Sequence, residues 1–420
     1  MASDDRSSND ASPGDTGRHA DGWGLPFAAM CVIQVAGPFT LASLPVTAPL
    51  LTAAAGVPPQ SIGLAASLQA IGSLVFLAFG KPILDRLGPV RAMQVGTLVG
   101  ALGVALAATA VWPLVLLAAL AIGAGYGPVP PASSSILMRV VPIDRRRTLF
   151  SLKQAMAPIG SMAASLIVPV GLLLAGHWRA GLLAGAVTIA MFALLLQPIR
   201  ERLDTPAIAF ARSRPASTLW RTAIAPFRML ARRPVLLLGL VGFCFTTVLG
   251  SVGAFAVTWL VTEHGLSATT AAGLYALMQM CSMPARVFAG WLADAIGSAR
   301  VTLALLSLGS FAILVAFATL ASPAGPRWLT AILCAVGFFQ AGWNGVLVSE
   351  IASVVAPHEV SDVTAATSAL MFFGYAVGPA VFTGLVAITG GYALPFALMA
   401  VLPLVCIVVL IGFVRHPTAD

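Results

Sequence analysis

Two positively charged residues, Lys153 and Arg286, lie within long apolar stretches of this 420-residue sequence. A charge inside a membrane-spanning helix costs at least about 2.5–3.5 kcal/mol, so such a residue usually faces a cavity or a partner. Either side chain could instead extend its long stem towards the lipid head groups. Glu350, near the end of its own apolar run, is the only acid inside a predicted span, apart from Asp362 at the first position of another. The two cations therefore predict a site completed by an anionic small-molecule substrate, with a carboxylate as the expected group, because arginine binds carboxylates bidentately.

Polar and aromatic residues in the same apolar runs are candidates for lining this site. Pro158 and Gly160 follow Lys153 closely and predict a broken helix, as found at transporter binding sites. The i, i+3, i+4 spacing of Gln340, Trp343 and Asn344 predicts that one helical face presents all three. For each residue the alternative is an interhelical hydrogen bond. The predicted substrate-binding residues are Lys153, Gln154, Arg286, Gln34, Gln340, Trp343 and Asn344.

The elements that position these residues follow from composition. The chain is 59% hydrophobic and only 9% charged, whereas soluble domains contain about 25% charged residues. Apolar runs of 18 or more residues predict membrane-spanning helices, because backbone groups must be satisfied internally in lipid. The ten-residue alternating segments of a β-barrel are absent. Twelve spans are predicted, at about 26–51, 60–83, 92–112, 114–138, 148–174, 180–199, 234–261, 268–292, 299–321, 328–353, 362–388 and 391–413.

The basic residues predict the orientation of these spans. With the N-terminus inside, the connections on the cytoplasmic side contain 19 of the 23 Lys and Arg residues, and the opposite side contains two. This asymmetry predicts a protein of the bacterial inner membrane with both termini on the cytoplasmic side. The basic residues meet anionic lipid head groups, which accounts for the net charge of +8 without a nucleic-acid partner.

An internal repeat divides the chain. The pattern D-x-x-G-x-x-R occurs at Asp85–Arg91 and again at Asp294–Arg300, 209 residues apart. Both copies follow the second span of a six-span half, and duplicated halves are typical of rocking transporters. We expect a disordered tail (1–24), an N-terminal six-helix bundle (25–199), a basic cytoplasmic loop (200–233), a C-terminal bundle (234–414) and a short tail (415–420).

With twelve spans and this repeat, the sequence resembles the Major Facilitator Superfamily. The second copy extends to G-x-L-x-D-x-x-G-x-x-R from Gly290, whereas Lys81 occupies the glycine position of the first. The stretch from Arg286 to Gly290 looks like the eighth span of monocarboxylate and oxalate/formate porters, where an arginine faces the organic anion. In monocarboxylate porters an aspartate one turn earlier carries the coupled proton, and here that residue is Ser282.

The repeated pattern also predicts a conformational latch between the halves. Its glycines would permit close helix packing. Its aspartates would accept backbone N–H groups at a neighbouring helix N-terminus, and its arginines would pair with an acid or a lipid phosphate. The alternative is that both aspartates are only turn residues. The predicted latch residues are Asp85, Arg86, Gly88, Arg91, Gly290, Asp294, Gly297 and Arg300.

We therefore predict a monomeric secondary transporter that moves a small organic anion by alternating access, with a proton or counter-anion as possible coupling ion. No enzyme motif, cofactor fingerprint or metal-ligand spacing occurs in the sequence, and we expect neither cofactor nor metal. Proton-driven efflux of a hydrophobic or drug-like compound is one alternative, although it would need a deep acid in the N-terminal half. A metabolite sensor is another, although it would need a signalling domain.

Overall fold

The computed structural model describes residues 22–142, 145–212, 228–319, 326–356 and 359–415, which form helices and short connections. The predicted tails lie almost wholly outside the described residues, since helix α1 begins at Gly24 and α20 ends at Arg415. The helices of the N-terminal half are α1 (Gly24–Ala54), α2 (Ile62–Phe79), α3 (Lys81–Leu87), α4 (Pro89–Ala107), α5 (Trp112–Tyr126), α6 (Val129–Val140), α7 (Arg146–Ala155), α8 (Ala157–Ala164), α9 (Ile167–Ala175), α10 (Trp178–Leu194) and α11 (Gln197–Arg212). Those of the C-terminal half are α13 (Arg233–Thr262), α14 (Ala268–Ile296), α15 (Ala299–Thr319), α16 (Pro326–Ala341), α17 (Trp343–Ser353), α18 (Val360–Thr389), α19 (Ala393–Met399) and α20 (Val401–Arg415).

Several spans consist of two or three consecutive helices. Ten helical segments within the described residues are long and apolar enough to cross a membrane, and the bent pair α10 and α11 makes an eleventh. The 29-residue α14 is long enough as well, but Arg286 and Asp294 lower its hydropathy, and it is not among those ten. With α14 counted, the segments correspond to the twelve predicted spans.

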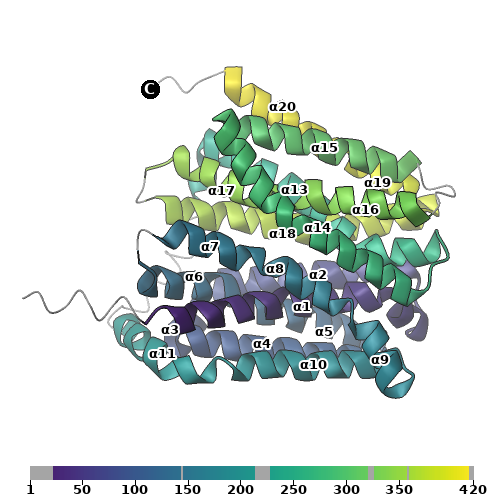
Figure 1. Cartoon of the computed structure of the whole chain (residues 1–420), viewed down its shortest axis with the longest axis horizontal. Helices are drawn as coiled ribbons and strands as arrows, with labels where there is room; N and C mark the ends of the chain where they lie inside the picture. Colours follow the sequence, from purple (N-terminus) through teal and green to yellow (C-terminus); the bar gives the residue numbers. More distant parts are fainter. Residues whose placement is uncertain (1–21, 143–144, 213–227, 320–325, 357–358, 416–420) are drawn as a thin grey trace, which may run out of the picture.

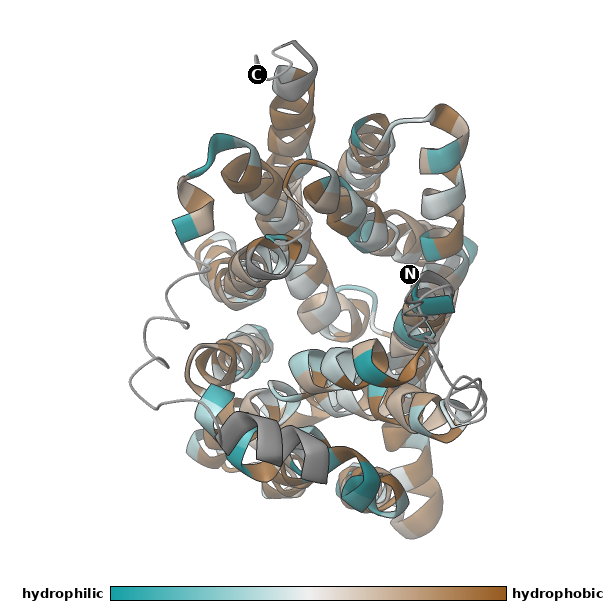
Figure 2. Ribbon diagram, turned by 90° about the vertical axis from the view of Figure 1, so that its left-hand side faces the viewer, coloured by the Kyte–Doolittle hydropathy of each residue, from teal (hydrophilic) through white to brown (hydrophobic). Residues whose placement is uncertain are grey.

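The two halves lie side by side, the N-terminal half purple to teal and the C-terminal half green to yellow (Figure 1). The helices run roughly parallel to one another, so that alternate connections meet at the same end of the molecule. We call the end that contains Gly88 and Gly297 the signature end. Figure 2 looks along the helices from that end and shows two groups of helices, with hydrophilic residues at several of the near helix ends.

Large apolar side chains cover the outside of both halves. Leu173 is 85% exposed, Ile388 84% and Val408 71%. Exposed apolar surface on this scale needs an apolar solvent. The chain is therefore a multi-pass integral membrane protein, in agreement with its spans.

Small residues allow the helices within each half to approach closely. A Cβ atom added to Gly123 on α5 would collide with the Gln69 carbonyl on α2, and one added to Gly160 on α8 would collide with the Val35 carbonyl on α1. Such contacts are typical of membrane helix packing, in which backbones meet over glycine. They bind α8, which follows the break after Lys153, firmly to α1.

The connection between the halves begins later than the sequence predicted. Residues 200–212, expected as the start of a loop, continue the helix as α11. A tertiary contact explains this, because Asp204 of α11 binds the first turn of α4. Residues 213–227 of the predicted loop lie outside the described residues.

The halves also contact each other at the end opposite the signature end. The Thr383 hydroxyl on α18 donates to the Gln60 carbonyl at 3.0 Å, just before α2. A Cβ atom at Gly63 would lie 2.5 Å from the Pro379 carbonyl oxygen. The backbones of α2 and α18 are therefore in direct contact at this end.

Candidate functional site

Arg286 joins the two halves near the middle of the molecule. It lies two residues after Pro284 in α14, and its Nη1 atom donates to the backbone carbonyl of Gln154 on α7 at 3.2 Å. Its Nε atom is buried and has no hydrogen-bond partner within the described part of the chain. The side chain as a whole is half-buried. An arginine with an unused buried donor can bind an additional acceptor, such as a carboxylate oxygen.

The carbonyl that Arg286 binds is available because of a proline. In an α-helix the Gln154 oxygen would accept from the amide of residue 158, but Pro158 has no N–H. The helix breaks here, with α7 ending at Ala155 and α8 beginning at Ala157. The break predicted after Lys153 is thus present, and it supplies an acceptor for the opposite half.

Two of the four tyrosines lie near this arginine. Tyr126 on α5 and Tyr375 on α18 are both within electrostatic range of Arg286. The phenol groups can donate to an anion and their rings can stack on an apolar body.

Glycines on the first helix of each half make room for both of these rings. A Cβ atom at Gly37 of α1 would lie 2.6 Å from Cε2 of Tyr126, and one at Gly250 of α13 would lie 2.9 Å from Cδ1 of Tyr375. Both tyrosines are half-buried and lie near the middle of their spans. Neither half alone surrounds Arg286, because Tyr126 belongs to one and Tyr375 to the other.

Lys153 occupies a buried position beside this cluster and does not extend to the surface. Its side chain is 3% exposed, and its Nζ atom donates to the Ser133 hydroxyl of α6 at 2.8 Å. The same nitrogen lies 5.8 Å from the centre of the Phe150 ring. The alternative that Lys153 reaches the head groups is therefore wrong for this conformation. No carboxylate pairs with Lys153 or Arg286 in the described part of the chain.

The tenth-span residues do not share one face as predicted. The helix is interrupted at Gly342, between α16 and α17, so Gln340 lies on a different helix from Trp343 and Asn344. Trp343 is 1% exposed and stacks on Phe245 at 5.1 Å, inside the C-terminal half. It packs in the core, and we no longer assign it to the substrate site.

The other predicted lining residues differ in burial. Gln340 is 1% exposed, and both polar atoms of its amide are buried without partners among the described residues. Gln34 is 6% exposed and Asn344 is half-buried. Gln154 contributes its backbone oxygen to the Arg286 bond, which the sequence could not show.

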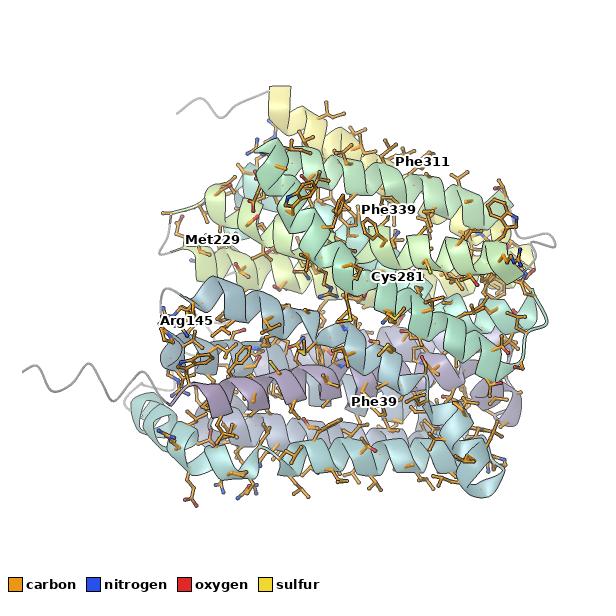
Figure 3. All side chains as sticks on the ribbon, viewed as in Figure 1. Phe39, Arg145, Met229, Cys281, Phe311 and Phe339 are labelled. Atoms are coloured by element: carbon orange, nitrogen blue, oxygen red, sulfur yellow. The ribbon has the colours of Figure 1, made fainter. Side chains whose placement is uncertain are left out.

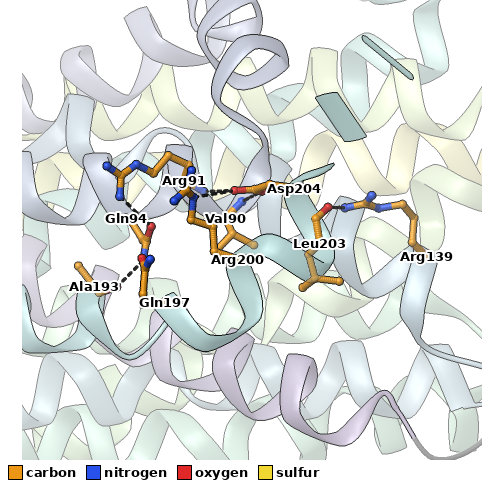
Figure 4. Close-up of polar contacts among 9 residues, drawn as sticks. All are labelled: Val90, Arg91, Gln94, Arg139, Ala193, Gln197, Arg200, Leu203 and Asp204. Atoms are coloured by element: carbon orange, nitrogen blue, oxygen red, sulfur yellow. Dashed lines mark hydrogen bonds and ion pairs between the residues drawn. The ribbon is translucent and has the colours of Figure 1, made fainter. Parts of the chain in front are cut away.

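The first copy of the repeated pattern is held by an acid that the sequence analysis did not select. Asp204 accepts from the Val90 amide at 2.8 Å and from the Arg91 amide at 3.0 Å, and so caps α4 (Figure 4). Gly88 has φ +83°, and a Cβ there would lie 2.6 Å from the Asp204 carboxyl carbon. The prediction that Asp85 binds this helix start is wrong, because Asp85 pairs with Lys81 at 3.6 Å.

The arginines of this copy are exposed. Arg86 lies on the surface, while the Arg91 guanidinium donates to Gln94 at 3.4 Å. Near them, Arg139 donates to the Leu203 carbonyl at 3.3 Å (Figure 4). These bonds fasten α11 to α4 and α6 within the N-terminal half.

The second copy is held by a different acid. Arg300 Nε lies 2.5 Å from Glu350 Oε1, which joins α15 to α17. Gly297, with φ +69°, ends α14, and Asp294 is exposed. The expected close packing at Gly290 is wrong, because no atom lies within 4 Å of a Cβ placed there.

The boundary between the halves is formed mainly by α1, α2 and α8 on one side and by α13, α14 and α18 on the other. Cys281 on α14 and Phe39 on α1 lie on opposite sides of this boundary (Figure 3). At the signature end, the Arg145 guanidinium lies 6.0 Å from the Trp23 ring (Figure 3).

Comparisons with known proteins agree with this architecture. The family model of the Major Facilitator Superfamily matches residues 30–379. Uncharacterised MFS-type transporters of two Mycobacterium tuberculosis strains, CDC 1551 and H37Rv, are 25% identical over 368 residues, which is 86% of this chain and 78% of theirs.

Solved structures share the fold at low identity. The nucleoside transporter NupG has a TM-score of 0.74 at 14% identity, with 94% of this chain and 100% of that chain covered. The Escherichia coli fucose:proton symporter FucP has a TM-score of 0.65 at 17% identity, with 95% of this chain and 100% of that chain covered. A bacterial homologue of the human lysosomal transporter Spinster, solved in an inward-facing and unoccupied conformation, has a TM-score of 0.72 at 13% identity. The match covers 94% of this chain and 98% of that chain. On the match of the family model, this chain belongs to the Major Facilitator Superfamily.

Proposed function

We propose that this transporter moves a small organic anion, with a carboxylate bound by Arg286. The observation that supports this most directly is the buried Nε atom of Arg286, which has no partner among the described residues. A guanidinium in a membrane interior needs an acceptor for each donor, and a carboxylate supplies two oxygens in matching geometry. The positively charged centre has no fixed acid within the described residues, which favours an anion over a cation or a neutral compound.

The position of Arg286 supports alternating access. Its side chain binds the Gln154 carbonyl of the other half at 3.2 Å. A bound carboxylate would compete for the same guanidinium and weaken this link between the halves. Substrate binding would thereby lower the barrier to rocking of one half against the other.

The 19-to-2 distribution of basic residues supports an inner-membrane location with both termini in the cytoplasm. The signature end then faces the cytoplasm. The described chain alone supplies both sides of the site, so a monomer is sufficient.

Exchange in proteoliposomes tests the proposal. Vesicles loaded with unlabelled compound would be assayed for uptake of labelled pyruvate, 4-aminohippurate, uridine and fucose, with protein-free vesicles subtracted. We expect exchange of at least one of the two carboxylates. Arg286→Ala should reduce it about 100-fold, since truncating one partner of a buried charge pair costs about 2–5 kcal/mol.

Arg179→Ala is the matched control, because Arg179 is exposed and its guanidinium stacks near Trp178, far from the site in sequence and fold. It should exchange the carboxylates at the wild-type rate. Exchange of uridine or fucose without either carboxylate would overturn the proposal, as would undiminished carboxylate exchange by a folded Arg286→Ala protein.

A further inference from the structure

Among the described residues, Lys153 has fewer hydrogen-bond partners than an ammonium group needs. Three N–H donors are available on a charged lysine, and the structure gives its Nζ one acceptor, the Ser133 hydroxyl. At 3% exposure the side chain has almost no contact with water. A buried ammonium with a single neutral partner is poorly stabilised, because burying a charge is costly. A neutral amine in the same place avoids that cost.

The elements packed around α7 provide no fixed counterion in the described part of the chain. Helix α1 presents the Cys31 thiol, which interacts electrostatically with Lys153. Helix α6 presents Ser133, and α7 itself presents the Phe150 ring. Helix α8 has no titratable residue between Ala157 and Ala164.

Ser133 can serve both protonation states of the lysine. Its oxygen accepts from a charged Nζ, and its hydroxyl hydrogen can then point to the Pro130 carbonyl, 3.4 Å away. With a neutral amine, the same hydroxyl can donate to the nitrogen lone pair. A carboxylate here would instead hold the proton permanently, so a hydroxyl is the partner suited to reversible protonation.

We propose that Lys153 takes up and releases the proton that accompanies the anion, which makes the protein a proton–anion symporter. This inference rests on the function proposed above. Lys153 is adjacent to Gln154, whose carbonyl binds Arg286, so the proton site and the anion site are linked through one peptide unit.

The charges balance in this cycle. The neutral Nζ lone pair of the empty carrier forms an N–H bond with a proton from water on the entry side. That bond breaks on the other side, where the proton returns to water and the anion leaves. The empty carrier has the Arg286 charge alone, and the loaded carrier adds one ammonium and one monocarboxylate. Both forms therefore have the same net charge, and the membrane potential does not drive transport of a monocarboxylate.

The experiment measures pyruvate and 4-aminohippurate in proteoliposomes with an inside pH one unit above the outside pH. One proton per monoanion predicts accumulation of about tenfold at equilibrium, since a tenfold ratio corresponds to one pH unit. Protein-free vesicles correct for passive entry of the undissociated acids. Lys153→Arg should keep anion exchange but accumulate neither probe above onefold, because the guanidinium stays charged.

Lys81→Arg is the matched control, since Lys81 is the only other lysine and lies on the surface in an ion pair that arginine preserves. It should keep the tenfold accumulation. Ser133→Asp is a second test that retains the lysine, and its fixed acid should also abolish accumulation while exchange continues. Thermal unfolding of each purified variant establishes that it is folded.

The outcomes separate the two proposals. If the wild-type protein exchanges neither probe, the proposed function is wrong and this inference falls with it. If the wild type exchanges an anion without accumulation, the anion proposal stands and the symport inference is overturned. Tenfold accumulation by a folded Lys153→Arg protein would place the proton on another group and overturn the role of Lys153.

Discussion

The carboxylate of Asp204 accepts a hydrogen bond from the Val90 amide at 2.8 Å, across 114 residues of sequence. Its second oxygen accepts from the Arg91 amide at 3.0 Å. The free N–H groups at the start of α4 are thus satisfied by a side chain from the last helix of the same half. Asp204 thereby joins α11 to α4 at the signature end of the N-terminal half.

Removal of Asp204 should destabilise the protein more than removal of Asp85. Asp204→Ala removes a buried cap, which is worth about 0.5–2 kcal/mol. Asp85→Ala removes an i, i+4 ion pair whose side chains are 44% and 33% exposed, and such pairs contribute only about 0.3–0.5 kcal/mol. Thermal unfolding in detergent provides the comparison, and an equal loss for both variants would contradict the assignment of the cap.

The Arg300–Glu350 pair should show stronger energetic interaction than the surface pair Arg232–Glu359. Glu350 is 8% exposed, so removing Arg300 leaves a nearly buried carboxylate without that partner. A double-mutant cycle with Arg300→Gln and Glu350→Gln should give an interaction energy of about 0.5–3 kcal/mol for this pair.

The same cycle on Arg232 and Glu359 provides the control. That pair is bidentate at 2.7 and 2.8 Å, but the arginine side chain is 50% exposed. Solvent screening limits such pairs to about 0.2–1 kcal/mol. A larger interaction energy for Arg232–Glu359 than for Arg300–Glu350 would show that burial does not strengthen the latter pair.

The glycine contact between α8 and α1 should not tolerate a side chain. Gly160→Val would force the α8 backbone away from the Val35 carbonyl, and overpacking of this kind costs about 1–3 kcal/mol. Gly273→Val on α14 is the matched control, because nothing lies within 4 Å of its added Cβ. The two melting temperatures should differ clearly, and similar values would mean that α8 can shift freely.

His264, in the connection after α13, should make the protein less stable in mild acid. Burial lowers the pKa of His264 below its usual 6.5, and neighbouring Glu263 only partly opposes this. The unfolded chain then binds the proton more readily than the folded one. The stabilisation is complete above about pH 6.5 and is lost as the pH falls through the lower folded value.

Thermal unfolding between about pH 7 and pH 5 tests this effect. The melting temperature of the wild type should fall with pH more steeply than that of His264→Phe, which keeps a ring beside Trp259. Parallel curves for the two proteins would exclude His264 as the source of acid sensitivity.

The sequence predicted the membrane helices and the family because both depend on local features. Apolar runs mark the spans, and the spacing of Asp85 and Asp294 marks the duplication. The breaks were harder to place. Pro158 was visible in the sequence, but the interruption at Gly342 occurs within an apolar run that a continuous helix would fit equally well.

The predicted site was incomplete because the missing residues meet only in the folded chain. Lys153 and Arg286 stood out as charges in apolar surroundings. Tyr126 and Tyr375 lie in the glycine-rich stretches G-x-G-Y-G-P and G-Y-x-x-G-P, whose glycines and prolines by themselves are typical of bent, closely packed helices. Their shared composition was the available signal, and only the three-dimensional structure places both rings near one arginine.

The contact of Thr383 with the Gln60 carbonyl joins the two halves through uncharged groups, whereas carboxylates brace the signature end inside each half. Dissolved ions screen charges and have little effect on a hydroxyl bond or on backbone contact. Rising salinity should therefore weaken the exposed ion pairs of the signature end, such as Lys81–Asp85, and leave the contact between the halves unchanged.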